Sequence, residues 1–192
     1  FSDILVNVHE GDLVEVLMFL KSGVAEVAIT YDMYLDTSVI FEPLMDLAIQ
    51  VGLSVDDPLA RQSSIRIKQL EDKPMILLDY PVTEVYFQNL LRNQGIEPKV
   101  ECRTKTTQMI RSMVAAGEGF ALFLLHPKGM TTTDGSELTY VPLETTQVPP
   151  KLGLAFPSQF LPTRTIKTFA AECRSIVQSQ KALDSFLMRP KV

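Results

Sequence analysis

The sequence lacks tryptophan and has only two cysteines, Cys102 and Cys173, among its 192 residues. The two thiols lie far apart and lack the short spacing of a metal site, which favours free thiols over a disulfide framework or a metal centre. Free thiols are typical of reducing compartments, so we expect the protein in the cytoplasm. No apolar run reaches the roughly 18 residues that a bilayer-spanning helix needs, and we expect no membrane contact.

Positive charge is also scarce. The chain has 18 Lys and Arg residues against 23 Asp and Glu residues, which gives a net charge of −5 and a pI near 5.1. DNA binding needs cations that cluster on one face to contact phosphates, and the sequence contains no such cluster. We therefore predict that this chain does not bind DNA by itself.

Catalytic motifs are lacking as well. There is no G-x-S-x-G, Walker loop, H-E-x-x-H or C-x-x-C. The segment Gly117-Glu118-Gly119 follows a helical pattern and precedes a strand, the reverse of a dinucleotide fingerprint, so we interpret it as a helix stop. His9 and His126 each end a predicted strand without an implied Ser, Cys or carboxylate partner, which favours structural roles. We predict no enzymatic activity and no cofactor.

Apolar residues make up 46% of the chain, enough for a sizeable core, and they follow strand-like and helix-like patterns in turn. The stretch 99–125 shows this order most clearly. It contains a short extended segment, a threonine-rich turn, an apolar helical stripe, Gly117 as a stop and a buried strand. The stretch 13–29 repeats the order around Gly23. Two similar half-units are one interpretation, and two unrelated strand–helix units of an α/β protein are the other.

The remaining patterns predict an α/β protein with two Rossmann-like lobes. Strands are expected at 4–8, 24–29, 38–51 with an interruption at Pro43, 75–78, 138–143 and 152–156, and helices at 13–21, 84–93 and 165–179. Asp12 and Thr83 are placed to cap helices, and Phe169 is expected on an inner helix face. The polar segments 52–62 and 144–150 are expected to cross between the lobes. Lobe I then comprises residues 1–53 and 149–192, and lobe II residues 54–148.

Polar turns that end three of the predicted strands are the candidate binding site. In a two-lobed α/β arrangement, ligands bind at the carboxyl ends of strands and at helix N-termini, where backbone N–H groups favour an anion. Thr83 and Thr106 are equally consistent with a role as helix caps only. Arg103 and Lys105 are available to a ligand carboxylate, but their pattern favours solvation. The predicted binding residues are Thr30, Tyr31, Asp79, Tyr80, Thr83, Thr104, Thr106 and Thr107.

Four segments resemble the effector-binding (substrate-binding) domain of LysR-type transcriptional regulators. They are V-N-V-H-E-G-D at 6–12, L-K-S-G-V-A-E-V-A-I at 20–29, D-D-P-L-A at 56–60 and M-V-A-A-G-E-G-F-A-L at 113–122. Their order and spacing cover nearly the whole chain, from Leu5 to Val177. The resemblance implies a fold like that of type 2 periplasmic binding proteins, with two lobes joined by two crossing segments.

The resemblance also implies a partner and a ligand. In such domains a small effector, often an organic or aromatic acid, binds between the lobes and alters how a dimer or tetramer holds DNA. In an antiparallel homodimer, the helix at 13–21 would pair with the helix at 108–116 of a second chain. Phe19 and Arg111 are expected on the outer sides of these helices. The residues predicted for this interface are Leu13, Leu17, Phe19, Met109, Arg111 and Met113.

Family members carry an N-terminal winged helix-turn-helix domain and linker helix, and their sensing domain begins with a strand and helix that have no counterpart in lobe I here. We therefore expect DNA contact only through that N-terminal domain. Two alternatives remain at this point: a solute-binding protein of a transport system, which would share the lobes, and, less favoured, an enzyme on the same scaffold.

Overall fold

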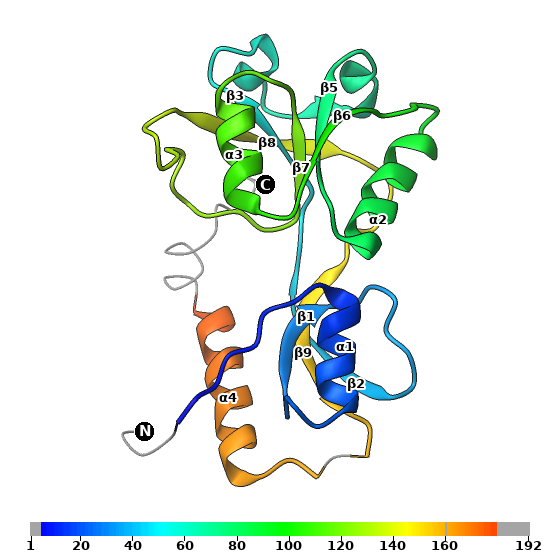
Figure 1. Cartoon of the computed structure of the whole chain (residues 1–192), viewed down its shortest axis with the longest axis vertical. Coiled ribbons are helices and arrows are strands. Elements are labelled where there is room, and N and C mark those ends of the chain that lie inside the picture. The colour runs from blue at the N-terminus through cyan, green and yellow to red at the C-terminus, as the bar shows by residue number, and fades with distance from the viewer. Residues whose placement is uncertain (1–4, 160, 180–192) are drawn as a thin grey trace.

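The chain forms two lobes, stacked along the long axis of the molecule (Figure 1). This is a computed structural model that describes residues 5–159 and 161–179. Lobe I, the lower half of Figure 1, contains a three-stranded sheet and two helices. Its elements are α1 (Leu13–Lys21), β1 (Ala28–Tyr31), β2 (Val39–Asp46), β9 (Lys151–Pro157) and α4 (Arg164–Gln178).

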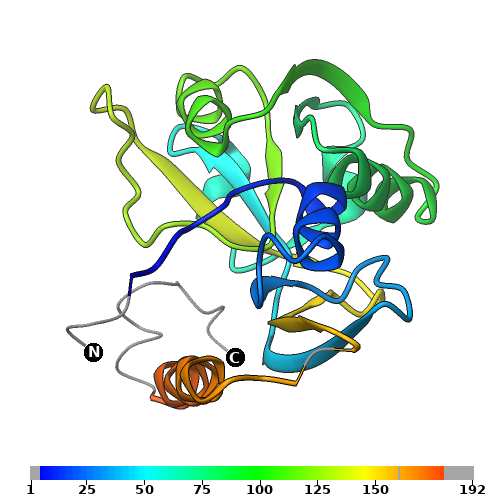
Figure 2. The same ribbon diagram turned by 60° about the horizontal axis from the view of Figure 1, so that its bottom comes forward.

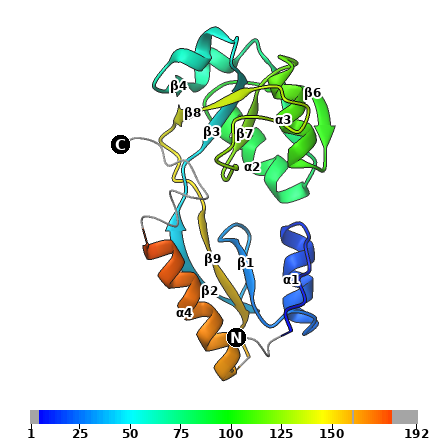
Figure 3. The ribbon, with the colours of Figure 1, turned by 90° about the vertical axis from the view of Figure 1, so that its left-hand side faces the viewer.

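The lobe I sheet is antiparallel, with the order β1-β9-β2. Gly153 in the central strand lies opposite Thr30 on one side and Pro43 on the other. The predicted interruption at Pro43 is wrong, because β2 continues through it with only a register irregularity before Met45. Proline is tolerated there because β2 is an edge strand. Helices α1 and α4 cover opposite faces of the sheet (Figure 3).

Lobe II is built around a mixed sheet. Its helices are α2 (Pro81–Arg92) and α3 (Thr107–Ala115), with short 3₁₀ turns η1 (Pro58–Arg61) and η2 (Ile67–Leu70). Its strands are β3 (Gln50–Ser54), β4 (Ile65–Arg66), β5 (Pro74–Leu78), β6 (Lys99–Thr104), β7 (Ala121–Phe123) and β8 (Leu138–Glu144). Hydrogen bonds order these strands as β4-β8-β3-β7 and, in parallel, β5-β6.

One bridge joins these two parts of the lobe II sheet. Met75 pairs with Phe120 in parallel orientation, ahead of β7. The Phe120 N–H donates to the Pro74 carbonyl at 2.9 Å, and the Ile76 N–H donates to the Phe120 carbonyl at 2.8 Å. Phe120 is 1% exposed, so this junction lies in the core.

Local chemistry explains where the helices begin and end. Asp12 and Glu15 form a capping box at α1, in which the Asp12 carboxylate accepts from the Val14 and Glu15 N–H groups at 2.8 and 2.9 Å. Gly117 ends α3 with a φ of 83°. Its N–H donates to the Val114 carbonyl, and the next N–H donates to the Met113 carbonyl, the pattern of a Schellman motif. The predicted cap at Asp12 and stop at Gly117 are confirmed.

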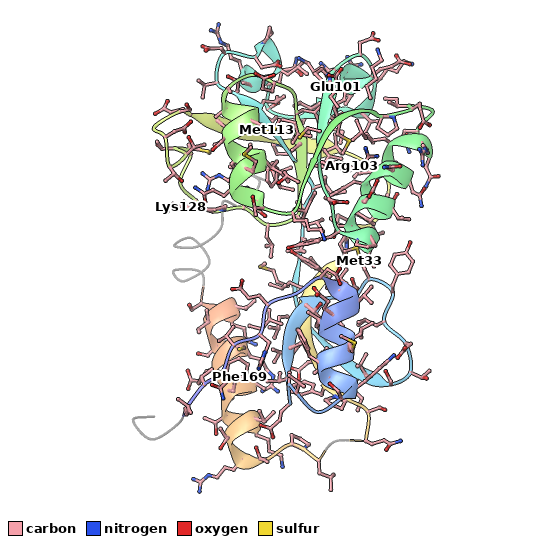
Figure 4. All side chains as sticks on the ribbon, viewed as in Figure 1. Met33, Glu101, Arg103, Met113, Lys128 and Phe169 are labelled. Atoms are coloured by element: carbon pink, nitrogen blue, oxygen red, sulfur yellow. The ribbon has the colours of Figure 1, made fainter. Side chains whose placement is uncertain are left out.

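Other local predictions are wrong. Residues 5–8 form no strand, and Leu5, Val6 and Val8 are exposed, because no neighbouring strand pairs with them; Ile4 lies outside the described residues. Helix α2 begins at Pro81, ahead of the predicted Thr83 cap, since proline suits the first helical position. Phe169 on α4 (Figure 4) is 39% exposed, so the sheet covers this residue of the predicted inner face only in part.

The crossing segments are short. Strand β3 starts at Gln50 and pairs with β7 and β8, so it belongs to the lobe II sheet, and the first crossing lies at 47–49, ahead of the predicted 52–62. The second connects β8 to β9 at 145–150. The largest apolar cluster extends across the lobes, since Leu13 and Met33 of lobe I join a core formed mainly by lobe II. The two lobes therefore share buried surface.

Candidate functional site

Two predicted binding turns meet at the edge of lobe II that faces lobe I. Strands β5 and β6 run in parallel, so their carboxyl ends lie at the same edge (Figure 1). The Asp79 N–H donates to the Thr104 carbonyl at 2.9 Å and ties these ends together. The structure thus brings together the turns that carry Asp79 and Thr104. Both side chains are half-buried.

The N-terminus of α2 starts from this edge. Tyr80 is its N-cap residue, with an extended backbone, and its side chain makes no capping hydrogen bond. Thr83 lies within the first turn of α2, so the capping role considered for it is not observed. The first N–H groups of α2 therefore lack an acceptor from their N-cap side chain, which favours an anion at this position.

The N-terminus of α3 starts from the same edge. Thr106 is its N-cap, and the Thr106 Oγ1 accepts from the Met109 N–H at 3.3 Å. The Thr104 Oγ1 accepts from the Thr106 N–H at 3.4 Å. Thr106 and Thr107 are both exposed. The capping role considered for Thr106 is confirmed, and its hydroxyl still lies at the surface.

The predicted lobe I residues are less accessible. Thr30 is 5% exposed within β1. Tyr31 is half-buried, and burial raises the pKa of its hydroxyl to about 12. Tyr31 therefore stays neutral at physiological pH and is able to donate a hydrogen bond.

A pocket of about 320 Å³ lies between α1, the loop after β1 and the start of α2. Its walls are mainly apolar and include Leu17, Met18, Met33, Tyr34 and Val82. Figures 2 and 3 show the N-terminus of α1 next to the first turn of α2. None of the eight predicted binding residues lines this pocket, which the sequence analysis missed. A signal was present in the apolar run Met33-Tyr34-Leu35, which lies between Asp32 and Asp36.

Two ion pairs lie near the edge and the pocket. Arg103 on β6 contacts Glu84 on α2, with its Nε 3.3 Å from Oε1 (Figure 4). At the far end of the pocket, the Lys21 Nζ lies 2.7 Å from the Asp36 carboxylate. Hydrogen bonds from Lys21 and Ser38 hold the pKa of the Asp36 carboxyl well below its usual range. Lys105 is exposed, as its alternating pattern predicts.

The residues predicted for self-association divide into buried and accessible ones. On α1, Leu13 is buried, while Leu17 and Phe19 are half-buried. On α3, Met109 is 52% exposed, and the half-buried Met113 has its Sδ 3.6 Å from the Cys102 Sγ (Figure 4). Two exposed apolar residues of α1, Val14 and Met18, were missed, because helical spacing alone does not show which stripe the core covers.

Arg111 departs from its predicted orientation. The sequence analysis placed it on the outer side of α3, but only 9% of it is exposed. Its guanidinium Nη2 donates to the carbonyls of Gly129 and Thr131, at 2.6 and 3.1 Å. The loop between β7 and β8 covers this side of α3, which the helical pattern does not reveal.

His126 ends the apolar run that contains β7 and has a structural environment. It is 6% exposed, and its ring stacks on Tyr140 with centroids 3.6 Å apart and planes 11° apart. Its Nδ1 lies 3.0 Å from the Pro127 carbonyl oxygen. Burial lowers the pKa of His126, and the Arg111 charge lowers it further.

We expect the unfolding free energy to fall as the pH decreases from about 6.5, because the unfolded chain then binds the proton that folded His126 resists. His126→Phe keeps a ring on Tyr140 and removes the titration, so its stability should fall less between pH 6.5 and 5. Urea denaturation at several pH values measures this difference. His9→Gln, which replaces an exposed histidine, is the control and should follow the native chain. An equal loss of unfolding free energy between pH 6.5 and 5 in the native chain and His126→Phe would refute the prediction.

Within residues 5–159 and 161–179, no group of three or more His, Cys, Asp or Glu side chains is arranged to hold a metal ion. No helix of that part of the chain combines the length and apolar character needed to cross a membrane. Both cysteines there are free thiols.

Solved structures share this architecture. HinK, a LysR family transcriptional regulator from Pseudomonas aeruginosa, is 28% identical, with a TM-score of 0.81 over 87% of this chain and 58% of HinK. The chain thus spans less than two thirds of that regulator. The CcmR regulatory domain from Synechocystis PCC6803 is 18% identical, with a TM-score of 0.73 over 86% of this chain and 80% of that domain. The BenM effector-binding domain is 18% identical, with a TM-score of 0.71 over 95% and 81% of the two chains.

Sequence comparison gives the family. No curated protein sequence matches this chain significantly. The family model of the LysR substrate binding domain matches residues 1–178. The fold is accordingly the mixed α/β fold of type 2 periplasmic binding proteins, and the resemblance carried by the four sequence segments is confirmed. The chain belongs to the LysR substrate-binding domain family, whose members are the regulatory, effector-binding domains of transcriptional regulators.

Proposed function

We propose that this domain senses a small organic acid, which binds between its lobes and modulates DNA binding by a winged helix-turn-helix domain of the same cytoplasmic regulator. The observation that carries the proposal is the N-terminus of α2, which has no side-chain cap and lies with the N-terminus of α3 at the sheet edge facing lobe I. A carboxylate matches both the free N–H groups and the helix dipole.

Helix α1 of lobe I does not compete for the ligand. The N-terminus of α1 also faces lobe II, but the carboxylates of Asp12 and Glu15 already accept its hydrogen bonds. An added anion is therefore best placed at α2, with Thr106 and Thr107 of α3 as hydroxyl partners. Within the family, the BenM domain was solved with its effector benzoate and the CcmR domain with 2-PG.

Binding signals only if the ligand prefers one arrangement of the lobes. The shared apolar core provides a route, since Leu13 and Met33 of lobe I belong to the cluster on which Val82 of α2 packs. A ligand held at the N-terminus of α2 would bias this packing. The change would then reach α1, which is half of the proposed dimer contact.

The dimer is proposed as an antiparallel pairing of α1 with α3 of a second copy. Val14 and Met18, one turn apart on α1, and Met109 on α3 are 56%, 58% and 52% exposed, so both helices offer accessible apolar surface to this pairing. Leu13 and Arg111 are buried within the chain, so they would hold α1 and α3 in place without contacting the second copy.

A titration of organic acids by calorimetry tests the effector site. Thr106→Asp keeps an N-cap for α3 and adds a negative charge at the edge, so it should weaken binding of a carboxylate about tenfold or more while the domain stays folded. The matched control is Thr163→Asp. Thr163 caps α4 through the same bond, with its Oγ1 accepting from the Ile166 N–H at 3.3 Å, on a helix that covers the other face of lobe I.

The proposed site requires that the two substitutions differ in their effect on the affinity for the acid. We expect Thr163→Asp to bind the acid with native affinity. Equal losses in both variants would mean that net charge, rather than position, governs binding. A broad acid panel without a single binder would reject the proposed ligand class.

A further inference from the structure

The pocket beside α1 offers mainly apolar contacts. Its volume of about 320 Å³ is within the range of small-molecule sites. Except for Lys21, every residue that lines it has an apolar or aromatic side chain. Two of them, Met18 and Met33, carry thioethers, which adapt to ligands of irregular shape. A ligand in this pocket gains from burying carbon atoms, whereas a hydroxyl group on it would lose water with few partners to replace it.

Lys21, the charged residue of the pocket, already has a partner. Its Nζ lies 2.7 Å from the Asp36 carboxylate, which also accepts from the Ser38 N–H at 2.9 Å. Hydrogen bonds from Lys21 and Ser38 hold the pKa of Asp36 well below its usual range. The carboxylate therefore stays ionised at physiological pH and balances the ammonium charge. A ligand carboxylate is better matched to the other end of the pocket.

That other end is the first turn of α2. Val82 is the second residue of this helix, and it lines the pocket. Pro81 has no N–H, and the Glu84 N–H donates to the Tyr80 carbonyl at 2.8 Å. The N–H groups of Val82 and Thr83 are thus the ones that the uncapped helix leaves without an acceptor. Val82 connects the apolar walls of the pocket with the preferred position of a carboxylate.

The loop after β1 holds its side of the pocket in a fixed shape. The Lys151 N–H donates to the Asp32 carboxylate at 2.7 Å, and the Asp32 N–H donates to the Lys151 carbonyl at 3.1 Å. Asp36 fastens the other end of the loop to α1. Between these two anchors, Tyr34 has a φ of 53°, which is uncommon for tyrosine, and Met33 is buried where the lobes meet (Figure 4). Because the pocket is already formed, a ligand pays little ordering entropy to occupy it.

We propose that the effector is a monocarboxylic acid with an apolar body, which lies in this pocket while its carboxylate accepts from the Val82 and Thr83 N–H groups. The inference rests on the proposed function for the carboxylate, and it adds the chemistry and position of the rest of the ligand. Sugar acids and phosphorylated acids are excluded as effectors, because their hydroxyl groups or second charge would enter an apolar pocket. A ligand placed in this way contacts α1 and α2 together, so it favours the arrangement that brings the lobes close.

Two sets of NMR signals follow the two ends of the ligand separately. The backbone amide signals of Val82 and Thr83 report the carboxylate, and the ¹³C-labelled methyl signals of Met18 and Met33 report the body. Hexanoate should shift both sets. Acetate should shift only the amides. The methyl signal of Met113 on α3, outside the pocket, is the internal reference and should not move.

The affinity should depend on the length and polarity of the body. From acetate through butyrate to hexanoate, each added methylene group should strengthen binding about fourfold in amide titrations. Gluconate has the carbon chain of hexanoate with a hydroxyl group on each body carbon. It should therefore bind no more tightly than acetate, although its carboxylate is the same.

Val14→Phe tests the position of the body. Val14 lines the pocket and is 56% exposed, so a larger side chain there is compatible with the fold and takes up space that the ligand needs. The affinity for hexanoate should fall at least tenfold, whereas acetate should bind as it does to the native chain. Val85→Phe is the matched control and should keep both affinities, because Val85 lies on α2, is 46% exposed and does not line the pocket.

Three outcomes would overturn the proposal. Equal affinities for acetate and hexanoate, with amide shifts but no methyl shifts, would leave the carboxylate site at α2 intact and reject the apolar body. A failure of every acid to shift the amides would reject the proposed effector site as well. An affinity for hexanoate that falls as the chain self-associates would assign the pocket to a second copy, because Val14 and Met18 also belong to the proposed dimer contact.

Discussion

Replacing Gly119 with alanine is expected to lower the free energy of unfolding by about 3 kcal/mol. A Cβ at this position would lie 2.4 Å from the Pro74 carbonyl oxygen, a backbone atom that has no freedom to rotate away. The same oxygen accepts from the Phe120 N–H at 2.9 Å. The added methyl group would therefore separate β5 from β7, at the one bridge between the two parts of the lobe II sheet. Urea denaturation followed by circular dichroism measures the loss.

Gly129→Ala is the control for this substitution. A Cβ at Gly129 would meet no atom within 4 Å, and its backbone does not require glycine. We expect its unfolding free energy to stay within about 0.5 kcal/mol of the native value. If Gly119→Ala is as stable as Gly129→Ala, the 119–120 backbone does not lie as close to β5 as the structure places it.

Gly153→Ala should destabilise lobe I by a similar amount, about 3 kcal/mol. A Cβ there would lie 2.4 Å from both the Glu42 carbonyl oxygen and the Phe41 ring, between the central strand β9 and β2. Because the largest apolar cluster crosses between the lobes, the loss should appear as a shift of one unfolding transition. Urea denaturation and hydrogen exchange at β5 and β9 together show whether both lobes respond.

Ile40→Ala is the control for lobe I. Ile40 lies in β2 and pairs with Phe156 of β9, but 55% of it is exposed. Its truncation should cost less than about 1 kcal/mol. Two separate transitions in Gly153→Ala, with only one of them shifted, would show that the lobes unfold independently and would argue against coupling through the shared core.

These substitutions also bear on effector sensing. If the lobes unfold together, a change in packing between α1 and α2 is felt by both sheets. A ligand at the N-terminus of α2 then acts on the helix proposed to contact a second chain. If the lobes are independent, the connecting segments at 47–49 and 145–150 must carry the signal instead.

Local signals in the sequence were reliable at the start of α1 and the end of α3, and they failed at Pro43 and Thr83. Asp12 and Glu15 specify the start of α1 through a capping box, and Gly117 specifies the end of α3, because only glycine adopts a φ of 83° without strain. The four motif segments were enough to indicate the family. None of these features depends on residues distant in the chain.

Burial within a helix was less predictable. Ile110 and Val114 of the apolar stripe in α3 are buried, but the stripe gave no sign that the loop between β7 and β8 would cover Arg111. The pocket along α1 combines Met33 with Val82, residues that lie in different lobes. A periodic pattern reports one face of an element, and contacts with distant segments are not contained in it.

The sequence by itself determined the α/β class, the family and the polar turns at the strand ends, since each follows from residue types at short spacing. Tertiary structure decided the rest. Strand pairing placed β3 in lobe II, because hydrogen-bond partners are chosen between distant segments. It also buried Arg111 and left α2 without a side-chain cap. The proposed effector site therefore depends on long-range packing, which fixes the direction and burial of groups whose chemistry the sequence supplies.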